Sequence, residues 1–185
     1  MQKQAELFHE ARDFIYRYSD TPFRLASGGE SHHYFNCKAI TMHPGRLRQL
    51  AEIIRDWLLP NAALPVPQAA GGLTLGADPI AFALARAWQD QGQLVMPVVV
   101  RKEAKGHGTS QQIEGLLDGV HEVLLLDDVI TTGGSSLKAV QALRQAGYIV
   151  RHCVCIVDRE EGGEANLQSE GITLLPVWKK SDFIA

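Results

Sequence analysis

Cysteine, net positive charge and long hydrophobic runs are all scarce in this sequence. Its three cysteines, Cys37, Cys153 and Cys155, form neither a CxxC pair nor an even disulfide framework, which favours buried, reduced thiols. The formal net charge of −3 argues against broad binding to nucleic acids or membrane surfaces. The first residues lack the apolar core of a signal peptide, and no run approaches the roughly 20 apolar residues of a membrane span. We therefore expect a cytoplasmic protein.

The spacing of apolar residues predicts a single α/β domain. Apolar runs alternate with helical patterns in the second half of the chain, which is typical of a parallel sheet covered by helices. Strands are predicted at residues 68–70, 97–100, 123–126, 149–157 and 172–175. Helices are predicted at residues 2–18, 46–59 (ended by Pro60), 80–89 (capped by Asp78) and 136–146. We expect a doubly wound parallel sheet in residues 41–185 and a small N-terminal hood, containing a hairpin, in about residues 1–40.

An apolar strand, two acids and a glycine-rich loop follow one another at residues 123–136, which read VLLLDDVITTGGSS. The glycines let the backbone turn tightly and direct several N–H groups at one point, and the N-terminus of the next helix adds donors. This pattern predicts a phosphate-binding loop, with Asp127 and Asp128 placed to accept hydrogen bonds from sugar hydroxyls or to approach Mg²⁺. The alternative is a turn that caps the helix beside two solvated acids. Because the GxxxxGK[ST] pattern is absent, a P-loop nucleotidase is disfavoured.

Cations also follow two other predicted strands. Residues 101–109, RKEAKGHGT, gather three cations and a histidine, and such a segment can bring positive charge to a developing anion. The alternative is a solvated basic turn. In residues 157–163, VDREEGG, Arg159 can form a surface ion pair with Glu160 or Glu161, or it can bind a carboxylate through its planar fork.

These motifs resemble those of a known enzyme family. Residues 123–136 look like the signature that binds phosphoribosyl diphosphate (PRPP) in the type I phosphoribosyltransferases. Residues 101–109 and 157–163 resemble the catalytic loop and the base-binding segment of the orotate phosphoribosyltransferases. The loop at residues 71–81 is similar to the family's pyrophosphate-side loop, and the hood segment with Tyr34 and Phe35 also fits. The resemblance implies transfer of a phosphoribosyl group from PRPP to orotate, giving orotidine 5′-monophosphate and pyrophosphate in UMP biosynthesis.

The resemblance also assigns roles to individual residues. The implied PRPP-binding residues are Arg101, Lys102, Lys105, His107, Asp127, Asp128, Val129, Ile130, Thr131, Thr132, Gly133, Gly134 and Ser135. Lys105, His107 and Asp128 would be the catalytic residues, and Thr131 and Arg159 would bind orotate. The family further implies Mg²⁺ bound mainly through PRPP, and a homodimer whose subunits share active sites.

Two positions depart from the family pattern. Many orotate enzymes carry a lysine where this chain has Ala26, and some carry one near Leu75. These absences place more weight on the basic loop for neutralising the leaving group, and they do not overturn the resemblance. Two alternatives to an orotate enzyme also stay open. One is a phosphoribosyltransferase for another base, in which Arg159 would be structural. The other is a non-catalytic regulator that senses PRPP, which would need a nucleic-acid-binding face that the net charge of −3 does not suggest.

Overall fold

The computed structural model describes residues 2–24, 29–103 and 112–184. Its N-terminal part consists of helix α1 (Gln2–Ile15) and an antiparallel ribbon of β1 (Tyr16–Arg24) and β2 (Glu30–Phe35), which forms a sheet of its own. The expected hairpin is confirmed. The expected helix over residues 2–18 is wrong in its last turn, because Tyr16 and Tyr18 already pair with Phe35 and His33 in the ribbon.

A helical segment follows the ribbon and packs against α1. It comprises α2 (Lys38–Thr41), α3 (Pro44–Ile53), a π-helical stretch η1 (Ile54–Leu58) and α4 (Leu59–Asn61). The helix predicted at residues 46–59 begins earlier, because the His43 side chain caps it by accepting a hydrogen bond from the Arg46 N–H. It also continues past Pro60. The widened π turn makes Pro60 part of the first turn of α4, where a missing N–H is tolerated.

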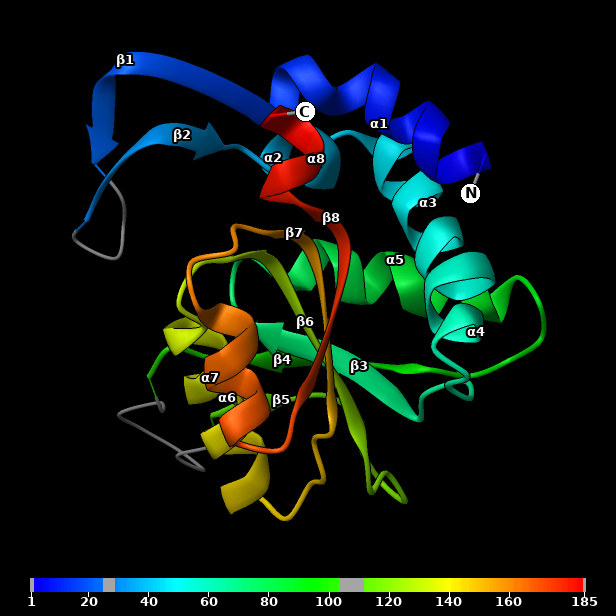
Figure 1. The fold of residues 1–185 in the computed structure, drawn as a ribbon. Helices are drawn as coiled ribbons and strands as arrows, with labels where there is room; N and C mark the ends of the chain where they lie inside the picture. The colour runs from blue at the N-terminus through cyan, green and yellow to red at the C-terminus, as the bar shows by residue number, and fades with distance from the viewer. Residues whose placement is uncertain (1, 25–28, 104–111, 185) are drawn as a thin grey trace.

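A six-stranded sheet forms the centre of the molecule, in the order β5-β4-β3-β6-β7-β8 (Figure 1). Its strands are β3 (Ala69–Leu73), β4 (Met96–Val100), β5 (Ile113–Glu114), β6 (Val123–Ile130), β7 (His152–Asp158) and β8 (Thr173–Lys179). All neighbouring strands pair in parallel except β4 and β5. The predicted α/β class with a mostly parallel sheet is therefore confirmed. Strand β6 is longer than predicted, so Asp127 and Asp128 lie within it rather than after it.

Helices cover both faces of this sheet, which divides the core into two clusters. On one face, α1, α3 and α5 (Asp78–Gln89) pack against strand residues that include Leu126 and Ile156. On the other, α6 (Gly134–Gln145) and α7 (Gly163–Ser169) pack against Leu125 and Cys155. Successive strand residues point to opposite faces, and since both faces are covered, the central strands consist mostly of apolar residues. Helix α8 (Lys180–Ile184) closes the chain against α1.

Local details of the sequence-based prediction need correction at two helices. Asp78 was expected to cap α5, but Ala77 occupies the N-cap position, and Asp78 Oδ2 instead accepts a hydrogen bond from the Thr74 hydroxyl at 2.6 Å. Helix α6 begins at Gly134, before the predicted residue 136. The short elements β5, α7 and α8 have no counterpart in the prediction, since two to seven residues carry no readable period.

The structure confirms the expectation for the cysteines. Cys37, Cys153 and Cys155 are buried free thiols. Burial raises the pKa of each thiol well above its usual value, which disfavours the reactive thiolate. Within the described ranges, none of the helices combines the length and the apolar character that crossing a membrane requires.

Candidate functional site

A cavity of about 520 Å³ opens where the carboxyl ends of β6 and β7 meet the N-terminal ribbon. Ligands of doubly wound sheets bind at this edge. The residues that line it are Arg24, Tyr34, Phe35, Asp127, Val129, Ile130, Thr131, Thr132, Gly133, Gly134, Ser135, Ser136, Lys138 and Arg159. The structure thus brings together most of the predicted PRPP-binding residues and both predicted orotate-binding residues. Arg101, Lys102 and Asp128 are not part of this wall, and Lys105 and His107 lie outside the described residues.

Residues 131–135, here called the phosphate loop, carry the chain from β6 into α6. Gly133 is the N-cap residue of α6 and has φ +78°, a left-handed conformation that glycine adopts without strain. No side chain caps this helix. The N–H groups of its first turn have no partner within the helix, and the helix dipole adds partial positive charge at the same place. The loop therefore offers an anion several backbone donors in the cavity wall.

Asp127 is buried beneath the phosphate loop, with 8 % of its surface exposed. Its Oδ2 accepts a hydrogen bond from the Ser136 hydroxyl at 2.5 Å, and its Oδ1 accepts one from the Asp128 N–H at 2.9 Å. Burial raises its pKa from 3.8 to about 7, against the lowering effect of the Ser136 hydrogen bond. Both oxygens thus already have protein partners. Asp127 joins the end of β6 to the start of α6, a connection that the sequence pattern did not reveal.

Replacing Asp127 by asparagine is expected to stabilise the protein at neutral and alkaline pH. The folded-state pKa of about 7 lies above the ordinary value of 3.8, so the protonated form favours folding, and this contribution is lost as the pH rises from about 4 through about 7. Relative to D127N, the wild type should lose roughly 1–3 kcal/mol of unfolding free energy between about pH 5 and about pH 8. Urea unfolding at both pH values measures this difference. D118N, at an exposed acid, is the control, and parallel pH profiles of wild type and D127N would contradict the prediction.

Asp128 faces the loop between β3 and α5 rather than the cavity. A Cβ placed on Gly76 would lie 2.7 Å from Asp128 Oδ1 and 3.3 Å from Asp127 Oδ1, so the backbone at Gly76 runs directly beside the two acids. Oδ1 of Asp128 also accepts a hydrogen bond from the Val129 N–H at 2.9 Å. The loop that the sequence assigns to the pyrophosphate side therefore lies beside the acids at the end of β6.

Arg159 projects into the cavity from the end of β7, with only 4 % of its side chain exposed. One terminal nitrogen, Nη2, pairs with Glu161 at 2.8 Å and donates to the His33 carbonyl oxygen at 3.3 Å. Its Nε is buried and has no hydrogen-bond partner. A buried unsatisfied N–H is costly. The guanidinium is therefore held by the ribbon and by Glu161, while its Nε is unsatisfied and has almost no accessible surface.

The ribbon places a neutral histidine, His33, beside the Arg159 guanidinium. Its Nδ1 forms a hydrogen bond with the Tyr16 hydroxyl at 2.8 Å. Burial lowers the pKa of His33, and the positive charges of Lys180 and Arg159 lower it further. The imidazole consequently adds no competing charge next to Arg159 at neutral pH.

Residues 101–103 of the basic segment at residues 101–109 are among the described residues, and Arg101 has contacts with the residues that follow the segment. The Arg101 N–H donates to the Gln112 carbonyl oxygen at 2.8 Å, and Gln112 Nε2 donates to the Arg101 carbonyl oxygen at 2.9 Å. Arg101 also pairs with Glu114 at 3.4 Å. These contacts close the base of the segment beside β4 and β5.

Sequence reasoning missed two cations in the cavity wall. Lys138 lies on α6 one turn after Gly134, so its position on the helix face above the phosphate loop could have been read from the spacing. Arg24 is the last residue of β1 and reaches the cavity only because the ribbon folds over the cavity. No local sequence pattern indicates this position. Together with Arg159, Lys138 and Arg24 give the wall three cations.

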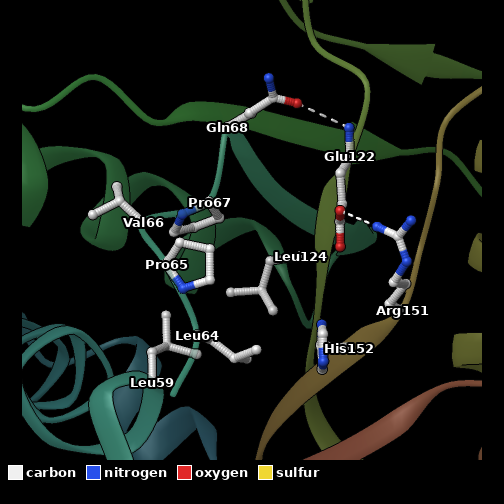
Figure 2. Close-up of a pocket in the computed structure, with 10 residues that line it drawn as sticks. All are labelled: Leu59, Leu64, Pro65, Val66, Pro67, Gln68, Glu122, Leu124, Arg151 and His152. Carbon is white, nitrogen blue, oxygen red and sulfur yellow. Dashed lines mark hydrogen bonds and ion pairs between the residues drawn. The ribbon is translucent and has the colours of Figure 1, made fainter. Parts of the chain in front are cut away.

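A second hollow, of about 300 Å³, lies at the opposite edge of the sheet (Figure 2). Its walls are mostly apolar, with Leu59, Leu64 and Leu124 among them, and the ion pair between Arg151 and Glu122 borders it. It adjoins the amino ends of β6 and β7, away from the edge where the phosphate loop lies. The cavity at the carboxyl edge is therefore the candidate functional site.

Comparison with known proteins identifies the class to which this fold and site belong. The sequence profile of the phosphoribosyl transferase domain matches residues 63–178, more than half of the chain. The chain therefore belongs to the phosphoribosyltransferase family.

Similar proteins place the chain more narrowly. It is 55% identical over 177 residues to an orotate phosphoribosyltransferase of Leptospira biflexa, covering 96% of this chain and 95% of the relative. It is 44% identical over 172 residues to that of Aquifex aeolicus, covering 90% and 89%. A crystal structure of the Mycobacterium tuberculosis orotate phosphoribosyltransferase in complex with PRPP matches with a TM-score of 0.75 at 28% identity, covering 99% and 92%. Within the family, the chain groups with the orotate phosphoribosyltransferases.

Proposed function

We propose that the protein is an enzyme that transfers the 5-phosphoribosyl group of PRPP to orotate, forming orotidine 5′-monophosphate and pyrophosphate. One observation carries this proposal. A phosphate loop at the start of α6 and the buried Arg159 line the same cavity. The loop suits the phosphate of the donor, and the arginine suits the carboxylate of the acceptor.

The donor side of the proposal uses the end of β6 and the start of α6. Backbone N–H groups of residues 131–135 would bind the 5-phosphate, and Lys138 would add positive charge beside it. Asp127 and Asp128 would accept hydrogen bonds from the ribose hydroxyls, with Asp127 exchanging its internal partners when it does so. The backbone beside Gly76 would lie against the pyrophosphate. The protein's contribution is then mainly positioning and electrostatics.

The acceptor side uses the end of β7 and the N-terminal ribbon. Arg159 would pair with the orotate carboxylate, and Thr131 would contact the ring. Tyr34 and Phe35 line the same cavity and can supply aromatic contact to a planar base. Adenine, hypoxanthine and uracil carry no carboxylate, so none of them would form a charged pair with Arg159.

The basic segment at residues 101–109 would stabilise the departing pyrophosphate through Lys105 and His107. Replacing Lys105 by alanine should lower kcat about tenfold, since the other cations of the segment remain, while the KM for PRPP changes less than about threefold. Steady-state kinetics with both substrates measures this split. Lys3→Ala, at an exposed surface pair with Glu52, is the control. An unchanged kcat would remove Lys105 from the mechanism.

Magnesium fits the site as an ion held mainly by PRPP. No group of three or more metal-ligating side chains occurs within residues 2–24, 29–103 and 112–184, and both oxygens of Asp127 already have partners. Asp128 is the residue best placed to contact the ion or its water shell. Mg²⁺ would neutralise phosphate charge on the substrate.

A homodimer with shared active sites is part of the proposal. An apolar hollow borders β4 and β5 and is lined by residues that include Phe82, Met96 and Leu116. Phe82 and Leu116 are 56% and 79% exposed, and large exposed apolar side chains that gather in one place mark contact surfaces. This surface adjoins Glu114, at the base of the basic segment. Sedimentation of the full chain tests the assembly.

One assay tests the proposed reaction. Purified protein with Mg²⁺ and PRPP should consume orotate and release pyrophosphate, and it should leave adenine, hypoxanthine and uracil unchanged. Turnover of another base in preference to orotate would reassign the acceptor. Binding of PRPP without turnover of any base would favour a regulator.

A further inference from the structure

Helix α7 lies directly against the phosphate loop, although none of its side chains lines the cavity. A Cβ placed on Gly163, the first residue of α7, would lie 2.6 Å from the Thr131 carbonyl oxygen and 2.3 Å from Ile130 Cγ2. A Cβ placed on Gly133 would in turn have Gly163 and Leu167 as its neighbours. The loop backbone thus rests on α7, on the side away from the cavity.

One side chain of α7 reaches the loop backbone itself. Asn166 Nδ2 donates a hydrogen bond to the Thr132 carbonyl oxygen at 2.9 Å. A trans peptide unit is planar, so its C=O and N–H point in opposite directions. Because Asn166 holds the Thr132 oxygen, the N–H of Gly133 in the same peptide unit is directed away from the Asn166 side chain. Thr132 and Gly133 both line the cavity.

We propose that Asn166 is a positioning residue for phosphate binding, which fixes the Thr132–Gly133 peptide so that the Gly133 N–H points at the 5-phosphate of PRPP. A backbone donor binds an oxyanion well only when it is already aligned. Gly133 needs such a restraint because it has a left-handed φ and no Cβ. The neighbouring Gly134 also lacks a Cβ. The inference rests on the proposed use of PRPP and adds a residue that does not touch the substrate.

The exposure of Asn166 makes this role separable from a role in folding. Asn166 lies on the exposed face of α7, and an exposed hydrogen bond adds little to stability. Asn166→Ala should therefore fold normally and raise the KM for PRPP about fivefold, the effect of one misaligned hydrogen bond. The KM for orotate and kcat should stay within about twofold of wild type. Gln168→Ala, on the same helix and without a side-chain bond to the loop, is the matched control.

A second readout uses inorganic phosphate as the probe. In ¹⁵N-labelled wild type, phosphate should move the Gly133 amide resonance, and in Asn166→Ala the shift should be smaller and need more phosphate. An unchanged KM and an unchanged Gly133 response would overturn the inference. So would a loss of thermal stability with equal rises in both KM values, because Asn166 would then act through folding. If the wild type bound neither PRPP nor phosphate, the proposed function itself would fail. If the wild type bound both and Asn166→Ala bound them equally well, only the role of Asn166 would fail.

Discussion

Replacement of Arg159 by alanine is expected to lower kcat/KM for orotate about a thousandfold, because truncating one partner of a buried charged pair costs several kcal/mol. The Kd for PRPP should change less than about threefold, since the phosphate loop on β6 and α6 is left in place. Arg159→Lys keeps the positive charge but loses the planar fork. It should therefore recover only a small part of the activity.

The surroundings of the Arg159 side chain explain this expected loss of activity. Arg159 is buried at the cavity wall, with Nη2 held by Glu161 and the His33 carbonyl oxygen and with Nε unsatisfied. The sequence allowed either a surface ion pair or a carboxylate site. The observed ion pair with Glu161 does not make Arg159 a surface residue, because 4 % of its side chain is exposed. The ion pair leaves the Nε of this buried guanidinium unsatisfied, and Arg159 lines the cavity, so we propose a carboxylate ligand for it.

A comparison of orotate with uracil distinguishes a role of Arg159 in recognising the orotate carboxylate from a role in stabilising the fold. Uracil lacks the carboxylate, so its weak binding, measured as a Kd, should be the same in wild type and Arg159→Ala, and the preference for binding orotate should collapse. Arg151→Ala is the matched control, since it removes an arginine at the amino end of the same strand, beside the second hollow (Figure 2). A comparable loss with both bases, together with a lower unfolding temperature, would make Arg159 a structural residue.

The parts of the site that the sequence predicted are those formed by consecutive residues. The phosphate loop is local. Its glycines, its hydroxyls and the helix after it all lie within residues 131–145, so their pattern indicated an anion site before any fold was known. The position of Arg159 was predicted for a related reason, because residues that follow parallel strands gather at one edge of the sheet. The boundary of β6 was not predicted, since Asp127, Val129 and Ile130 still pair with β7 although two acids interrupt the apolar run.

The supports of the site could not be predicted, because they join residues far apart in the chain. Asn166 and the Thr132 carbonyl are 34 residues apart, and the backbone accepts the bond, so no side-chain motif marks the contact. The His33 carbonyl that holds Arg159 is 126 residues away and lies in the ribbon. Gly163 follows Gly162 in a pair that reads as an ordinary turn. Only the packing of α7 against the loop distinguishes the two glycines.

Substituting alanine for Gly163 is accordingly expected to lower kcat/KM for PRPP about a hundredfold, as a displacement near 1 Å at a site does. Gly163 has an ordinary helical backbone, so alanine is acceptable there except for space. Its Cβ would lie 2.6 Å from the Thr131 carbonyl oxygen and 2.3 Å from Ile130 Cγ2. The phosphate loop and α7 must therefore move apart.

Gly162 provides the matched control for this substitution. It has φ +91° and nothing within 4 Å of an added Cβ, so Gly162→Ala strains the backbone without pressing on the loop. It should cost about 1 kcal/mol of unfolding free energy and leave the affinity for PRPP unchanged. Titration with PRPP and urea unfolding of both variants measure the two effects separately. If Gly163→Ala bound PRPP with the same affinity as the wild type, the loop would tolerate displacement. PRPP binding would then depend on the presence of the Gly133 N–H more than on its alignment.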